Sequence, residues 1–155
     1  MREIPYHIFD VFTDQPFSGN QLGVVPNASG LSGAAMQAIA REFNLSETIF
    51  FLPPDDAAHT AKVRIFMPNG ELPFAGHPTI GGAIAFTGAN DLPAKAQIIL
   101  EEGVGPVSCT VSADAFGGEA SFTAARIPEP ILFSSSEKAV AKALGGRRTI
   151  SARTH

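Results

Sequence analysis

The chain of 155 residues has one cysteine, no tryptophan and no basic cluster before its last residues. A lone cysteine, Cys109, excludes an internal disulfide and fits a reducing compartment. A net charge of −4 without a basic patch gives little support to nucleic-acid binding. No apolar run approaches the roughly 20 residues that span a bilayer, and no signal-peptide core follows Met1. We therefore expect a cytoplasmic protein that binds neither nucleic acid nor membrane.

Glycine, proline and phenylalanine, by contrast, are plentiful, with 15, 12 and 12 copies. Such a composition favours many turns and short strands over long helices. The length suits a single domain that can bury a sizeable core. We expect most of the phenylalanines to pack in that core rather than to form a stacking platform.

The spacing of apolar residues predicts both strands and helices. Strands are expected over residues 6–12, 22–25, 47–52 and 61–67, followed by an antiparallel meander over 97–102, 107–112 and 119–125. A helix opens after Ser32, a suitable N-cap, with an apolar stripe at Met36, Ile39, Ala40 and Phe43. A second helix runs through residues 78–86, and a third covers 137–144 behind the serines at 134–136.

The order of these elements predicts an α+β fold rather than a repeating βαβ unit, so a doubly wound nucleotide-binding fold is not expected. The glycines also fail the spacing of a dinucleotide-binding loop. Residues 1–145 form the expected folded unit. Residues 146–155 are basic, lack a periodic apolar face and resemble a frayed tail.

The segment 75–82, Ala-Gly-His-Pro-Thr-Ile-Gly-Gly, is the strongest candidate for a site. Gly76 allows a close approach of the backbone to a ligand, and Pro78 suits the first turn of a helix. The first N–H groups of that helix can receive a carboxylate beside His77. The alternative is a buried or capping histidine with a structural role.

Glu47 is the second candidate, because it lies where the amphipathic helix leads into the strand 47–52. The apolar run that follows it favours partial desolvation, which suits a carboxyl group to proton transfer near neutral pH. The alternative is a surface glutamate at the end of a helix.

The remaining polar residues are weaker candidates for a catalytic or binding site. Asn20 ends a polar loop for which an ordinary turn is the favoured interpretation, and Cys109 lies within a strand as a core thiol. His59 lies in a polar segment, where we expect it to be solvated. No grouping of His, Cys and carboxylates has metal-ligand spacing, so no metal is expected.

Three segments together resemble the PhzF-like family, relatives of the phenazine-biosynthesis isomerase with the diaminopimelate epimerase fold. They are Asp-Val-Phe-Thr-Asp-Gln-Pro-Phe-Ser-Gly-Asn at 10–20, Asn-Leu-Ser-Glu-Thr at 44–48, and Glu-Leu-Pro-Phe-Ala-Gly-His-Pro-Thr at 71–79. The resemblance covers the chain from Tyr6 to about Leu144. It implies a curved mixed sheet or barrel wrapped around a central helix, as one of two similar halves with the active site between them.

The resemblance also implies roles for individual residues. Glu47 matches the acid/base that moves a proton on a small carboxylated substrate without a cofactor. Asn20, Gly76, His77, Pro78 and Thr79 match positions around the substrate cleft. Ala75 stands where the related epimerases carry a cysteine, which favours carboxylate chemistry over a two-cysteine mechanism.

The chain departs from the family pattern in length, because family members are close to twice as long. The resemblance therefore covers only the N-terminal half, and an apolar face would be left uncovered. Two functions follow from this: an isomerase, or a half-molecule without turnover that serves as a self-associating binding module. Either is expected to form a homodimer.

Overall fold

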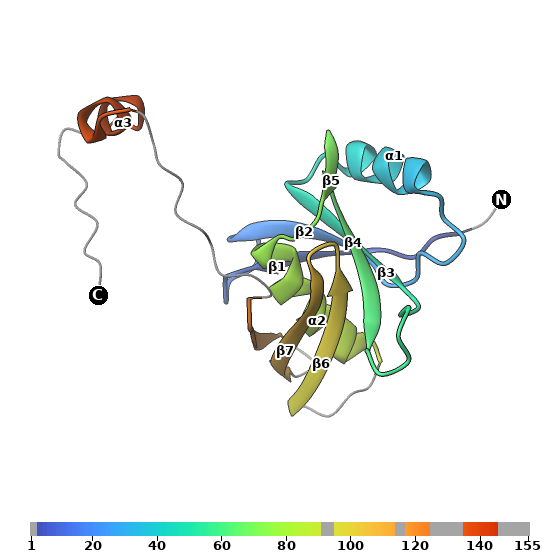
Figure 1. Cartoon of the computed structure of the whole chain (residues 1–155). Coiled ribbons are helices and arrows are strands. Elements are labelled where there is room, and N and C mark those ends of the chain that lie inside the picture. The colour runs from blue at the N-terminus through green and yellow to red at the C-terminus, as the bar shows by residue number, and fades with distance from the viewer. Residues whose placement is uncertain (1–2, 91–94, 114–116, 125–134, 146–155) are drawn as a thin grey trace.

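A curled sheet of eight strands wraps around one helix, α2 (Figure 1). The computed structural model describes residues 3–90, 95–113, 117–124 and 135–145. The strands are β1 (His7–Val11), β2 (Asn20–Val25), β3 (Glu47–Leu52), β4 (Ala61–Met67), β5 (Gly70–Leu72), β6 (Lys95–Glu102), β7 (Gly105–Ala113) and β8 (Gly118–Phe122). The helices are α1 (Gly33–Phe43), α2 (Gly76–Ala89) and α3 (Glu137–Ala143).

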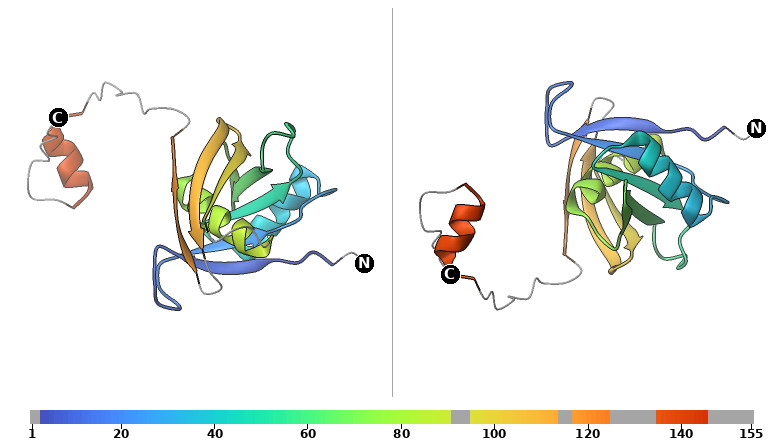
Figure 2. Two further views of the ribbon diagram at one scale, coloured as in Figure 1. Left: turned by 90° about the horizontal axis from the view of Figure 1, so that it is seen from below. Right: turned by 90° about the horizontal axis from the view of Figure 1, so that it is seen from above.

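The sheet runs in the order β1-β2-β3-β4-β6-β7-β8, and β5 pairs with β4 beside this path. The pairs β2–β3 and β4–β6 are parallel, and the other pairs are antiparallel. Both end strands of the path, β1 and β8, contact α2, as do β2, β3, β6 and β7. The sheet is therefore curved around the helix, seen along two further directions in Figure 2. The expected α+β fold, a curved sheet around a central helix, is confirmed.

Helix α2 can occupy this central place because it is apolar all round and rich in small residues. Gly81 and Gly82 are buried against the sheet. A Cβ atom at Gly81 would lie 2.6 Å from a methyl of Val11 and 2.7 Å from one of Leu22. The missing side chains let the backbone of α2 approach β1 and β2 closely.

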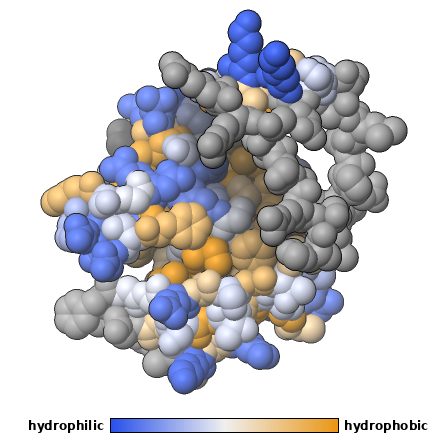
Figure 3. Space-filling model, turned by 90° about the vertical axis from the view of Figure 1, so that its left-hand side faces the viewer, coloured by the Kyte–Doolittle hydropathy of each residue, from blue (hydrophilic) through white to orange (hydrophobic). Residues whose placement is uncertain are grey.

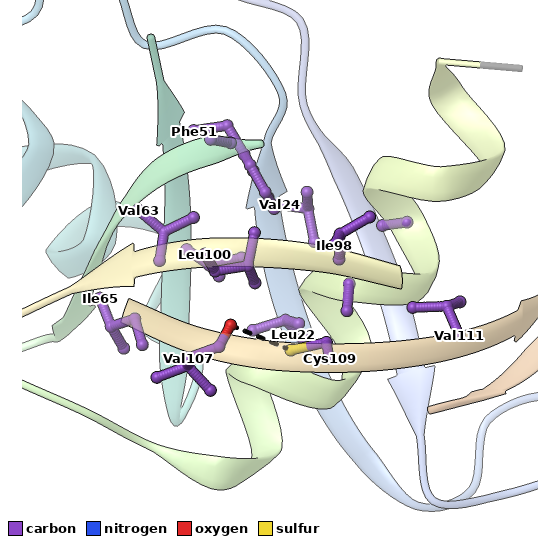
Figure 4. Close-up of a cluster of buried hydrophobic side chains, with 14 of the residues drawn as sticks. Leu22, Val24, Phe51, Val63, Ile65, Ile98, Leu100, Val107, Cys109 and Val111 are labelled. Atoms are coloured by element: carbon purple, nitrogen blue, oxygen red, sulfur yellow. Dashed lines mark hydrogen bonds between the residues drawn. The ribbon is translucent and has the colours of Figure 1, made fainter. Parts of the chain in front are cut away.

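The main core lies between α2 and the concave face of the sheet (Figure 4). Alternate residues of each strand point into it, as the period of a strand requires. The fully or nearly fully buried members include Leu22, Val24, Ile49, Phe51, Val63, Ile65, Ile98, Leu100, Val107, Cys109 and Val111. The prediction that Cys109 is a core thiol is confirmed, and burial raises its pKa to about 11.

Helix α1 packs on β3 and β4 and forms a second apolar cluster with the opposite face of the sheet. The Ser32 hydroxyl accepts a hydrogen bond from the Ala35 N–H at 3.2 Å, so the expected N-cap is confirmed. Met36 and Ala40 of the predicted stripe are buried. The helix ends at Asn44, whose left-handed φ of 52° turns the chain toward Glu47 at the start of β3.

The structure differs from the expected strands at a few points. The first strand ends at Val11 because Phe12 takes a left-handed φ of 64°. The short strand β5 was not expected: Pro68 and Asn69 form a turn, and Gly70 already pairs with Met67.

Helix α3 lies apart from the sheet in Figures 1 and 2. Its N-cap, Ser136, accepts a hydrogen bond from the Ala139 N–H at 3.3 Å, as the run of serines predicts. The tail expected over residues 146–155 lies outside the described residues. In the described part of the chain, no helix has the length and apolar character needed to cross a membrane.

Candidate active site

Three elements bring Asn20, Glu47 and His77 together at one end of the curled sheet. Asn20 and Glu47 are the first residues of β2 and β3, which run parallel with Leu22 opposite Glu47. Each shares the inward face of its strand with core residues, namely Leu22 after Asn20 and Ile49 after Glu47. His77, in the first turn of α2, completes the group.

His77 is bound on both ring nitrogens. Its Nδ1 lies 2.9 Å from Oε2 of Glu47, and its Nε2 lies 3.1 Å from the backbone oxygen of Asn20. The Asn20 side-chain nitrogen also lies 3.2 Å from Nδ1, and the Ser46 hydroxyl donates to Asn20 Oδ1 at 3.3 Å. The side chains of His77 and Glu47 are only 10% and 19% exposed.

These contacts assign the protons of the ring. A carbonyl oxygen only accepts, so Nε2 of His77 must carry hydrogen to bond Asn20. Nδ1 is then the nitrogen that gains or loses a proton. With a proton, it donates to the Glu47 carboxylate; without one, it accepts from the Asn20 amide or from a protonated Glu47. The contact between Nδ1 of His77 and Oε2 of Glu47 is therefore a hydrogen bond when either of the two atoms carries a proton.

The loop between β1 and β2 brings an aromatic side chain to this pair. The ring of Phe12 lies 6.0 Å from that of His77, and Phe12 is 69% exposed. Phe17, in the same loop, is 97% exposed, and its N–H donates to Asp10 at 2.8 Å. Both phenylalanines have φ of 64°, a conformation uncommon for bulky residues. Phe12 was not predicted as a site residue, because the alternation of residues 6–12 placed it in the first strand.

The other predicted site residues lie at the start of α2. Gly76 is the first helical residue, and a Cβ there would meet Phe122 at an ordinary 3.6 Å. The N-cap, Ala75, offers no side-chain hydrogen bond, so the positive end of the helix is not capped by its own side chain. Pro78 and Thr79 are buried. The roles of all these residues remain predictions.

Glu102, at the end of β6, is a buried carboxyl group that was not predicted from the sequence. It is 8% exposed, and its Oε1 lies 2.8 Å from the Thr79 hydroxyl. Burial raises the pKa of Glu102 to about 7, and the contact with Thr79 opposes that shift. The signal was present, because Ile98, Leu100 and Glu102 alternate on the inward face of one strand.

We expect Glu102→Gln to change how the stability of the protein depends on pH. The folded pKa of about 7 lies above the ordinary 4.5, so the folded state holds the proton more tightly. The stability contributed by Glu102 is therefore complete below pH 4.5 and is lost as the pH rises to 7. Relative to the wild type, the glutamine variant should gain about 1–3 kcal/mol between pH 5 and pH 8.

Urea unfolding followed by circular dichroism at these two pH values measures that gain. Glu119→Gln, at an exposed position of β8, is the control and should follow the wild type. If the free energy of unfolding depended on pH equally in the wild type and in Glu102→Gln, the raised pKa of Glu102 would be contradicted.

Two hollows lined by described residues lie away from the Glu47–His77 pair. One of about 640 Å³ lies where β4, β5 and the end of β6 diverge, and one of about 420 Å³ lies over β6, β7 and β8. The first contains the ion pair of Arg64 and Glu71 at 2.6 Å. Within the described ranges, no three His, Cys, Asp or Glu side chains gather as a metal site would require.

His59 lies near the first hollow rather than in solvent, so the expectation for it was wrong. It is half-buried, and its Nδ1 lies 2.9 Å from Glu101. Glu101 also accepts the N–H groups of Asp55 and Asp56 at 2.8 Å, which folds the polar segment back onto β6.

The sequence of the chain is similar to those of isomerases. It is 48% identical to an uncharacterized isomerase of Mesorhizobium japonicum over 140 residues, which are 90% of this chain and 46% of the relative. It is 44% identical over 102 residues to the trans-2,3-dihydro-3-hydroxyanthranilate isomerase of Pseudomonas aeruginosa, covering 66% of this chain and 35% of that enzyme. The chain thus spans about half the length, or less, of these curated relatives.

Solved structures show the same arrangement of the chain. A predicted epimerase of Pseudomonas aeruginosa matches with a TM-score of 0.71 and 36% identity, over 77% of this chain and 42% of that one. A hydroxyproline epimerase of Agrobacterium vitis, 14% identical, shares the fold alone with a TM-score of 0.54, over 68% of this chain and 38% of that one. The model of the phenazine biosynthesis-like protein family matches residues 9–153. The resemblance seen in the three sequence segments is therefore confirmed, and the chain belongs to the phenazine biosynthesis-like (PhzC-PhzF) family.

Proposed function

We propose that this chain carries the acid/base group of an isomerase that moves a proton on a small carboxylated metabolite. The observation that carries the proposal is the Glu47–His77 pair, held at 2.9 Å in a largely buried position. Its relatives are named isomerases, which supports this function and gives the alternative, a binding module without turnover, no support.

In the proposed reaction, the Glu47 carboxylate takes a proton from an acidic C–H bond of the substrate. The electron pair of that bond spreads over the conjugated system, and Glu47, now a carboxylic acid, returns the proton to another carbon. His77 stays neutral with its hydrogen on Nε2: its Nδ1 accepts from the Asn20 amide while Glu47 is a carboxylate, and from Glu47 once Glu47 holds the substrate proton. A proton moves without net oxidation or reduction, so the steps need no redox cofactor.

We assign the carboxylate of the substrate to the start of α2, beside Gly76 and His77. The unmatched N–H groups of a first helical turn attract anions. Asn20 orients the ring of His77 and completes the polar wall. Pro78 and Thr79, also predicted to bind substrate, are buried, so we assign them to shaping the helix start.

The substrate class follows from this chemistry and from one relative. A C–H bond becomes acidic enough for a carboxylate when the resulting charge spreads over a conjugated system. The Pseudomonas aeruginosa relative is named for such a compound, trans-2,3-dihydro-3-hydroxyanthranilate. We propose a conjugated, carboxylated ring of this kind.

The experiment is conversion of trans-2,3-dihydro-3-hydroxyanthranilate by the purified chain, followed by proton NMR. We expect the substrate signals to give way to those of an isomer of equal mass. Unchanged substrate, in the presence of a chain whose fold is verified by circular dichroism, would contradict the proposal for this compound.

We further propose that the chain is cytoplasmic and that residues 1–145 act as one half of a homodimer. The single cysteine supports the location. Apolar surface supports self-association: Phe12, beside His77, and Phe17, in the same loop, are exposed, and Figure 3 shows orange surface among hydrophilic groups on one face. Light scattering should give twice the chain mass of 16.2 kDa, and the chain mass itself would contradict the dimer.

A further inference from the structure

The hydroxyl group of Thr79 has more acceptors than it has protons. Its Oγ1 lies 2.7 Å from the backbone oxygen of Ala75 and 2.8 Å from Oε1 of Glu102. A hydroxyl carries one hydrogen, and a carbonyl oxygen only accepts. Both contacts are hydrogen bonds only if Thr79 donates to Ala75 and a protonated Glu102 donates to Thr79.

The surroundings of Glu102 fit an uncharged acid. Its Oε2 is buried and has no hydrogen-bond partner among the described residues, which would be costly for a carboxylate. The titratable neighbour on β7 is Cys109, whose pKa Glu102 helps to raise. On α2, His77 is engaged with Glu47. Toward β4 and β5, the hollow that Glu102 also lines holds Asp55, Lys62, Arg64, Glu71 and Glu101.

We propose that Glu102 is a positioning residue for His77. As an uncharged acid, it donates to Thr79, and Thr79 in turn donates to the Ala75 carbonyl. That carbonyl belongs to the N-cap of α2 and also accepts the Thr79 N–H at 3.1 Å. The chain of contacts therefore fixes the peptide that joins Ala75 to Gly76, one residue before His77.

Ionisation of Glu102 breaks this chain of contacts. A carboxylate only accepts, and its hydrogen bond from a hydroxyl is stronger than one to a neutral carbonyl. The Thr79 hydroxyl then donates its hydrogen bond to Glu102 instead of to the Ala75 carbonyl. The first turn of α2 thereby loses one hydrogen bond to its N-cap. The orientation of His77 toward Glu47 becomes less well defined in that state. The consequence for catalysis, unlike the contacts themselves, rests on the proposed function.

Carbon and nitrogen NMR of the full chain tests the inference without any substrate. The side-chain carboxyl carbon of Glu102 should titrate with a midpoint of about 7 rather than near 4.5. The amide nitrogen of Gly76 reports on the Ala75 carbonyl and should shift with the same midpoint. That shift should be lost in Glu102→Gln and in Thr79→Val, and it should be kept in Thr79→Ser, which retains the hydroxyl.

The effect on His77 has its own measurement. The chemical shifts of the His77 ring should change with the same midpoint as the Glu102 carboxyl carbon in the wild type and in Thr79→Ser. This change should be absent in Glu102→Gln. A midpoint of Glu102 near 4.5, or an unchanged Gly76 or His77 profile in Glu102→Gln, would overturn the inference. If the chain converts no substrate, the proposed function fails while these NMR results still decide the role of Glu102.

Discussion

Glu47→Gln is expected to slow isomerisation by about 10²–10⁴-fold, the usual contribution of a positioned acid/base group. Glutamine matches glutamate in size but does not take up a proton at neutral pH. Its amide can donate to Nδ1 of His77 across the present 2.9 Å contact, so the fold and the orientation of the ring should survive. The loss would then come from the missing proton acceptor rather than from a collapsed site.

The comparison needs two further variants. Glu42→Gln removes an exposed carboxylate on α1 and should leave the rate unchanged. Glu47→Asp keeps the carboxylate but withdraws it by one methylene, so it should retain part of the rate. Initial rates under saturating substrate measure all three. A Glu47→Gln variant that turns over like the wild type would remove Glu47 from the chemistry.

Gly81→Val is expected to lower the free energy of unfolding by about 3 kcal/mol, the upper end of the usual cost of overpacking a core. Even a single Cβ at this position would lie 2.6 Å from Val11 and 2.7 Å from Leu22. Val11 is β-branched and has few rotamers with which to yield. Either α2 moves away from β1 and β2, or the core repacks with strain.

Gly88→Val is the matched control, because Gly88 lies in the same helix with no atom within 4 Å of its Cβ position. Its effect should stay within about 0.5 kcal/mol, since valine and glycine differ little in helix propensity. Urea denaturation with fluorescence or circular dichroism measures both variants. Equal effects at the two positions would show that close packing of α2 on the sheet does not govern stability.

Local sequence patterns predict those parts of the fold that depend on local physics. The stripe ending at Phe43 and the Ser32 cap define α1, and alternation defines β4. Where backbone conformation overrides alternation, prediction fails: Phe12 interrupts a strand-like pattern because it adopts a left-handed conformation. The three-residue strand β5 is too short to carry a period of its own.

The candidate site, like the fold, could be predicted from the sequence only in part. Family resemblance singled out Glu47 and His77, but the register that sets Leu22 beside Glu47 is a long-range property of the β2–β3 pairing. The same is true of Glu102, whose burial depends on α2 lying against the inward face of β6. The alternation of β6 indicated an inward carboxyl group, whereas its partner, Thr79, lies 23 residues earlier in the chain.

The uptake of solvent deuterium at carbon tests the central claim most directly. The substrate is incubated with the chain in D₂O, and proton NMR identifies which carbon loses its hydrogen signal. Since the proton of a Glu47 carboxylic acid exchanges with the solvent, we predict deuterium at the carbon that receives the proton with the wild type and none with Glu47→Gln. Equal incorporation by both proteins would contradict the account.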